Sequence, residues 1–207
     1  MRSTHRADLH VHTINSDGAH TAQELIDRSA KSLCLLSFCD HDTFGAYSSD
    51  LVLPKTMRLL PGIEMSCQVG DSDLHMLAYF PKGLTGEILS WGRLLETDRK
   101  ERVLNGVSQL RESGVPLLWK DFEAETGSSV PCRSHVARAL IRGGLCDSAG
   151  QAFRQWLRQG IFRRPQITAE EAFQQVHELD GLTYWAHPQA DQIRTHGERL
   201  IKAGLDG

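Results

Sequence analysis

The chain has 207 residues, of which 40% are hydrophobic, and its formal net charge is -3 at pH 7. This length can bury one sizeable core, and the small negative charge excludes a protein that binds nucleic acid through a generally basic surface. Five cysteines without a Cys-x-x-Cys pair argue against a disulfide framework. Because the sequence shows neither a secretion signal nor about 18 consecutive apolar residues, we expect a soluble, cytoplasmic protein without membrane contacts.

Short apolar runs alternate with an amphipathic helical pattern in the first eighty residues, which is typical of an α/β protein. A helix is predicted over Thr21–Ser32, because Thr21 and Glu24 have the spacing of a capping box. Four strands are predicted at Ala7–His12, Leu35–Cys39, Arg58–Met65 and Leu74–Tyr79.

The stretch 84–159 is charged, amphipathic and helix-rich. We interpret it as a helical insertion within one α/β domain, whose two parts are residues 1–83 and 160–207. The α/β pattern resumes in the second part, where Thr168 and Glu171 again have capping-box spacing. There the sequence predicts helix Thr168–Leu179, strand Leu182–Ala186 and helix Gln189–Ala203.

The first candidate site residues are two histidines on the first predicted strand. His10 and His12 are two residues apart, so both side chains project from one face and can converge on one metal ion. Asp17 follows in a Ser-Asp-Gly sequence. Taken alone, a His-x-His pair often arises by chance, and an aspartate in such a turn ordinarily faces solvent.

A second group, Asp40-His41-Asp42, comes directly after the apolar strand Leu35–Cys39. One interpretation is a surface turn with two solvated aspartates. The alternative is a site, because parallel α/β folds gather their ligands at the carboxyl ends of strands. In that case Asp40 and Asp42 are predicted to orient His41 through hydrogen bonds.

Four further candidates complete the pattern: Glu64, His75, His135 and His187. Each histidine also has an ordinary structural interpretation. His75 could be a core histidine, His135 a helix-start contact and His187 a strand-end turn. Repetition favours a shared site, because independent structural histidines have no reason to gather at strand ends. The side chains at predicted strand ends are His10, His12, His41, Glu64 and His187.

Nitrogen and oxygen ligands without cysteine suit zinc, manganese or iron, and a carboxylate such as Glu64 can bridge two ions. Bridged ions about 3.5 to 4 Å apart generate a hydroxide nucleophile and neutralise charge on a phosphoryl transition state. The candidate residues therefore predict metal-dependent hydrolysis of phosphate esters.

These residues lie in six ordered motifs that resemble those of the PHP (polymerase and histidinol phosphatase) superfamily. The motifs are Asp8–Thr13 with Ser16–Gly18, Cys39–Thr43, Pro61–Ser66, Leu74–Leu77, Arg133–Ala137 and Ala186–Pro188. The helical insertion and the Arg-x-His-x-Ala segment are similar to those of the small stand-alone branch. Members of that branch hydrolyse nucleoside 3',5'-bisphosphates and trim RNA or DNA from the 5' end.

The resemblance implies a distorted seven-stranded (βα) barrel of PHP type with two to three divalent ions, Mn, Zn or Fe. It implies that Arg133 and His187 face the substrate phosphate. The ligand sets that it implies are, ion by ion, His10, His12 and Glu64; Asp17 and His41; and Glu64, His75 and His135.

The sequence departs from the family pattern in two places. The usual final Asp-x-His motif, which completes the first and second ions, is not found before the chain stops at Asp206-Gly207. We therefore expect a truncated or naturally short form in which the third ion site is best preserved. Arg163-Arg164 stands where the family tends to carry Ala-Tyr after a basic residue, so substrate contacts there are expected to differ.

The leading hypothesis is a phosphoesterase that acts on a small phosphorylated nucleotide or a short oligonucleotide, with no stable protein partner. Two alternatives stay open: a histidinol-phosphate-type phosphatase, and a non-catalytic PHP module that keeps its metals. A nucleic-acid-binding protein without chemistry is disfavoured, because the sequence lacks a basic stripe with interleaved aromatic residues.

Overall fold

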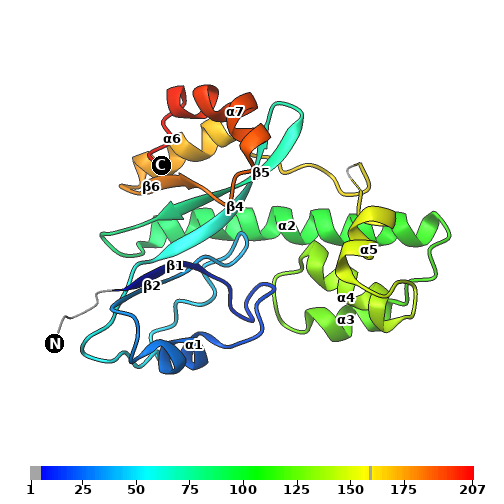
Figure 1. Cartoon of the computed structure of the whole chain (residues 1–207), viewed down its shortest axis with the longest axis horizontal. Coiled ribbons are helices and arrows are strands. Elements are labelled where there is room, and N and C mark those ends of the chain that lie inside the picture. Colours follow the sequence, from blue (N-terminus) through cyan, green and yellow to red (C-terminus); the bar gives the residue numbers. More distant parts are fainter. Residues whose placement is uncertain (1–5, 159) are drawn as a thin grey trace.

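The structure is a computed structural model that describes residues 6–158 and 160–207. Gln159, the last residue of the expected insertion, lies outside the described residues, as do residues 1–5. The described part of the chain forms seven helices and two small sheets (Figure 1). This mixed arrangement confirms the α/β class predicted from the sequence.

The first sheet is parallel and has the order β1 (Ala7–Val11), β2 (Leu35–Phe38) and β3 (Arg58–Leu59). Helix α1 (Ala22–Ser29) connects β1 to β2, and the predicted capping box of Thr21 and Glu24 is present at its start. The fully buried Ile26 side chain packs this helix against the apolar face of the sheet. The sheet thereby holds the ends of β1 and β2 side by side.

The second sheet is antiparallel and has the order β4 (Gly62–Val69), β5 (Ser72–Tyr79) and β6 (Leu182–Trp185). The sequence predicted one strand over Arg58–Met65, but the structure has two, β3 and β4, separated at Leu60-Pro61. The physical reason is that Pro61 has no backbone N–H to donate to a neighbouring strand.

The two sheets meet where β2 ends and β4 begins. His41 forms an isolated parallel bridge with Glu64, in which the Glu64 N–H donates to the Asp40 carbonyl at 3.2 Å and the Asp42 N–H donates to the Glu64 carbonyl at 2.9 Å. This junction brings residues from both sheets to one place. The seven-stranded barrel implied by the family resemblance stays a prediction.

Helix α2 (Gly86–Glu112) is long and belongs to two hydrophobic cores. Near its start, Ile88 and Trp91 pack in the same cluster as β4 and β5. Near its end, Val107 and Leu110 pack with the shorter helices α3 (Trp119–Thr126), α4 (Arg133–Arg142) and α5 (Ala149–Gln155). Figure 1 shows α2 running from the sheets to this helical region. Since residues of α2 belong to both cores, the cores themselves do not mark a boundary at residue 84. The division of the chain at that residue stays a prediction.

Two helices flank β6 in the last part of the chain, α6 (Ala169–Glu178) and α7 (Ala190–Lys202). The predicted capping box of Thr168 and Glu171 starts α6, and buried Phe173 packs this helix in the same core as β4 and β5. Among the described residues, no helix combines the length and the apolar character needed to cross a membrane.

Candidate metal centre and adjoining arginine cavity

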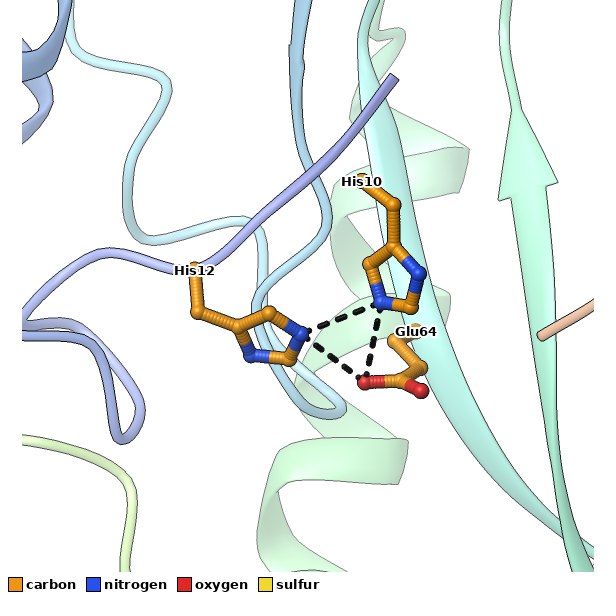
Figure 2. Close-up of side chains that lie close together, drawn as sticks. All are labelled: His10, His12 and Glu64. Atoms are coloured by element: carbon orange, nitrogen blue, oxygen red, sulfur yellow. Dashed lines mark hydrogen bonds and ion pairs between the residues drawn. The ribbon is translucent and has the colours of Figure 1, made fainter. Parts of the chain in front are cut away.

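Three side chains converge at the junction of the two sheets (Figure 2). His10 comes from β1, His12 follows that strand directly, and Glu64 comes from β4. Their side chains approach so closely that His10 Nε2 lies 3.1 Å from His12 Nε2. Glu64 Oε2 lies 3.3 Å from the first of these nitrogens and 3.0 Å from the second. Three potential metal-ligand atoms, two nitrogens and one oxygen, therefore lie within a few ångströms of one another.

The Glu64 carboxylate is the centre of a larger cluster. Its Oε2 atom also lies 3.1 Å from His41 Nδ1, and its Oε1 atom lies 3.0 Å from both His75 Nδ1 and His187 Nε2. Burial raises the pKa of Glu64, but hydrogen bonds from histidines outweigh burial and hold this pKa well below its usual range. The carboxylate is therefore ionised and can bridge metal ions.

Asp17 extends the cluster on the side of His12. Its Oδ1 atom lies 3.2 Å from His12 Nδ1, and its Oδ2 atom accepts a hydrogen bond from Ser134 Oγ at 2.7 Å and lies 3.8 Å from His41 Nε2. Burial lowers the pKa of His12, but hydrogen bonds to Asp17 and Glu64 outweigh it and raise the pKa to about 9. Without a metal, His12 therefore carries a proton at neutral pH.

The geometry and the donor chemistry fit divalent ions. Three groups have ligand atoms within 4.8 Å of one another: His10, His12 and Glu64; His12, Asp17 and His41; and His41, Glu64 and His75. The buried Nδ1 atom of His41 has no hydrogen-bond partner among the described residues, although it lies 3.1 Å from Glu64 Oε2. A buried nitrogen without a hydrogen bond is unusual, and a metal ion would satisfy it.

His135 is placed differently from the other predicted ligands. It is the third residue of α4, and its Nδ1 atom accepts a hydrogen bond from the backbone N–H of Cys132 at 2.9 Å, just before the helix. Its Nε2 atom lies 3.4 Å from Ser129 Oγ. In the described residues, His135 belongs to none of the three candidate ligand groups, and His41 takes its place beside Glu64 and His75.

The two aspartates beside His41 do not form the predicted hydrogen bonds to it. Asp40 accepts hydrogen bonds from the backbone N–H of Thr13 at 2.8 Å and from Ser16 Oγ at 2.5 Å, and so fastens the loop that carries Asp17. Asp42 accepts from the backbone N–H of Ser66 and from arginines of α2. Both carboxylates are 1% exposed, and a buried charge requires nearby donors.

Two cavities meet at His75. The cluster cavity, of about 330 Å³, is lined by His10, His12, Asp17, His41, Glu64, His75 and His187. The arginine cavity, of about 380 Å³, also includes His75 in its lining. Its charged lining consists of Asp71 and Asp73 together with six arginines, Arg99, Arg102, Arg133, Arg158, Arg163 and Arg164. This concentration of positive charge suits a polyanionic ligand.

Arg133 lines the arginine cavity, and His187 lines the cluster cavity. Within the described part of the chain, Arg133 has no carboxylate at ion-pair distance, and its Cζ atom lies 5.8 Å from the centroid of the Phe153 ring. His187 is 63% exposed at the rim of the cluster cavity. The other arginines were not predicted as site residues. The only sequence signal was the unusual Arg163-Arg164 pair.

A histidine–carboxylate cluster beside an arginine-lined cavity on an α/β fold is the arrangement of a metal-dependent phosphoesterase. Comparison with solved structures agrees. A structure assigned to a metal-dependent phosphoesterase from Bifidobacterium adolescentis has a TM-score of 0.77 and 26% sequence identity, covering 99% of this chain and 76% of that one. A sulfate-bound amidohydrolase from Chromobacterium violaceum, with a TM-score of 0.77 and 24% identity over 97% of this chain and 75% of its own, shares the fold.

Curated relatives narrow the class, although no protein-family model matches the chain. A 5'-3' exoribonuclease of Haemophilus influenzae is 29% identical over 89% of this chain and 69% of its own length. A 3',5'-nucleoside bisphosphate phosphatase of Chromobacterium violaceum is 28% identical over 94% and 71%. The exoribonuclease Rnm of Escherichia coli is 26% identical over 87% and 64%.

This chain thus spans between 64% and 71% of the length of these relatives. The likenesses confirm the resemblance found in the six motifs. The chain is related to the stand-alone PHP branch of metal-dependent phosphoesterases.

Proposed function

We propose that this protein hydrolyses phosphate esters of nucleotides or short oligonucleotides, nucleoside 3',5'-bisphosphates among them. The observation that carries this proposal is the position of His75, which lines both the histidine–carboxylate cluster and the arginine cavity. A phosphate ester at the cluster would therefore extend directly into a positively charged cavity. The names of the curated relatives support the same substrate class.

The cluster would hold two to three divalent ions, of manganese, zinc or iron. We assign them to the three groups of ligand atoms that the fold brings together, and Glu64 would bridge two of them. When bound, such ions supply charge neutralisation for the phosphoryl group and lower the pKa of water. The role of His135 as a ligand stays a prediction, and its place at the start of α4 supports a structural role.

The side chains at the rim would bind and orient the substrate. Arg133 has its guanidinium available for a phosphate oxygen, and two parallel N–H groups match a phosphate well. His187 Nε2, 3.0 Å from Glu64 Oε1, would hold a proton close to the phosphate. We further propose that the chain forms a seven-stranded PHP barrel in which residues 84–159 are an insertion. These residues supply Arg99, Arg102 and Arg133 to the cavity.

The first test is manganese-dependent release of phosphate from adenosine 3',5'-bisphosphate, with and without a chelator. Turnover that the chelator abolishes is the expected result. Histidinol phosphate serves as the competing substrate, and faster turnover of it would replace the nucleotide assignment. A protein that binds manganese stoichiometrically but hydrolyses neither compound would be a non-catalytic metal-binding module.

A further inference from the structure

Several buried charges line or adjoin the arginine cavity, and the function proposed above leaves open what holds them in place. Arg99 and Arg102, on α2, are 5% and 8% exposed, and the Asp98 side chain on the same helix is 14% exposed. Burying a charge is costly unless an opposite charge compensates it. The ion-pair partners of these three side chains therefore show which charged groups the fold holds in place.

The charges form an alternating row. Arg99 Nε donates to Asp42 Oδ2 at 2.8 Å, and Arg102 Nη2 donates to the same oxygen at 3.2 Å. Arg102 Nε then donates to Asp98 Oδ2 at 2.8 Å, and Arg163 Nη2 donates to Asp98 Oδ1 at 2.6 Å. Three guanidinium groups thus share two carboxylates, which leaves an excess of positive charge. All three arginines line the arginine cavity.

Asp98 joins two separate segments of the cavity wall, because each of its oxygens holds one arginine. Arg102 belongs to α2, whereas Arg163 belongs to the segment 160–165. Glu101 also lies near Arg163, at 3.8 Å, but its side chain is 62% exposed and an exposed pair at that distance contributes little. The position of Arg163 relative to Arg102 is therefore set by Asp98.

Two other contacts fasten the same segment. Arg164 Nε donates to Asp73 Oδ1 at 2.7 Å, which ties the segment to β5. The Phe162 ring occupies the space that a side chain at position 106 would need, so Gly106 allows the segment to approach α2 closely. The backbone is thereby held near α2. The Arg163 side chain makes its short hydrogen bond to Asp98, at 2.6 Å, and a longer one from Nη1 to the Arg164 carbonyl, at 3.4 Å.

We propose that Asp98 is a positioning residue that holds Arg102 and Arg163 in the cavity wall, where they bind a second anionic group of the substrate. This inference rests on the proposed function, because the reacting phosphate would lie at the cluster and the second group beyond His75. A substrate with one phosphate does not reach these arginines. Asp98 therefore sets a preference for substrates with two anionic groups.

The test compares wild type with Asp98→Asn, which has the same shape but no charge. Its KM for adenosine 3',5'-bisphosphate is expected to rise about tenfold, the loss of roughly one charge-assisted contact, with kcat changed less than about twofold. The kcat/KM for p-nitrophenyl phosphate is expected to stay within about twofold of wild type. Equal losses on both substrates would overturn the inference, because a general structural defect has that effect.

Three controls separate positioning from folding. Glu112→Gln removes an exposed carboxylate from the same helix and is expected to leave both substrates unaffected. Arg163→Gln, at a half-buried site, is expected to reproduce the KM rise of Asp98→Asn. In the Arg163→Gln background, adding Asp98→Asn is expected to have a smaller effect than in wild type, since the two side chains act together. Additive effects would contradict the assignment.

A binding measurement keeps this inference distinct from the proposed function. Titration of the chelator-treated protein with adenosine 3',5'-bisphosphate is expected to show about tenfold weaker binding for Asp98→Asn. If wild type binds the compound without hydrolysing it with manganese, and Asp98→Asn binds it about tenfold more weakly, the proposed function fails and the positioning role stands. If wild type hydrolyses it and the variant binds it equally well, the positioning role fails alone. Absence of binding by wild type would overturn the positioning role.

Discussion

The cluster cavity and the arginine cavity are neighbours, but they are built in different ways. Most of the cluster side chains stand at the ends of strands, within a few residues of apolar runs. The arginines come from α2, from α4 and from a segment without regular structure, and packing brings them together. The candidate metal ligands thus come mainly from the sheets, whereas the positive charge that we propose selects the substrate comes from helices and from the segment 160–165.

The strongest way to break the comparison is to remove a ligand that two groups share. His12→Ala is expected to lower phosphate release by at least about 10³-fold while the fold is retained, because His12 belongs to two of the three ligand groups. Metal content and activity are measured together. His20→Ala, a histidine outside the cluster, is the matched control. Full activity of His12→Ala would show that the cluster is not the site.

A substitution in the arginine cavity is expected to weaken substrate binding and to leave metal binding unchanged. Arg133→Ala should raise KM for a nucleoside bisphosphate about 10- to 100-fold, because its guanidinium has no carboxylate partner among the described residues and is available to phosphate. Bound metal, measured by elemental analysis, should not change. Arg142→Ala on the same helix is the control, since Arg142 pairs with Glu125. Loss of metal in Arg133→Ala would show that the two cavities are not separable.

The two cavities also differ in how many of their side chains could be predicted from the sequence. His10, His12, His41 and Glu64 were predicted because ligands gather at strand ends. Glu64 does belong to the cluster, although it lies near the start of β4 (Gly62–Val69) and not at the end of a strand. Arg99 and Arg102 were not, because a charged residue on an amphipathic helix ordinarily faces solvent and only tertiary contacts with Asp42 bury these two. The role of Asp42 was missed for the same reason, since its arginine partners are more than fifty residues away.

Proton release offers a finer test of the cluster. The pKa of His12 is raised to about 9 in the metal-free protein, so below that pH a proton occupies a nitrogen that a metal would need. Manganese affinity is therefore expected to rise by about tenfold per pH unit between pH 7 and 8 and to level off above 9. Calorimetric titrations in two buffers of different ionisation enthalpy measure the protons released. Constant affinity over this range would mean that His12 is not a ligand.

The smallest effect is expected where the helical region meets the segment 160–165. Gly106→Ala would place a methyl group against the Phe162 ring, and such overpacking costs about 1 to 3 kcal/mol. Thermal unfolding should show the loss of stability, and KM should rise while metal content stays the same. Gly114→Ala is not a suitable comparison, because that glycine has φ of +87°. Gly86→Ala, with no atom near the added carbon, is the matched control.

Helix α2 passes without interruption from one core to the other. Its helical periodicity therefore fixes how the residues of the second core are oriented relative to the first. One residue inserted after Leu95 would turn everything beyond it by about 100° around the helix axis. Asp98 and Arg102 would then point away from the cavity, although no residue of either core had been replaced. An insertion within this helix is therefore expected to weaken substrate binding more than an insertion of the same length in a loop.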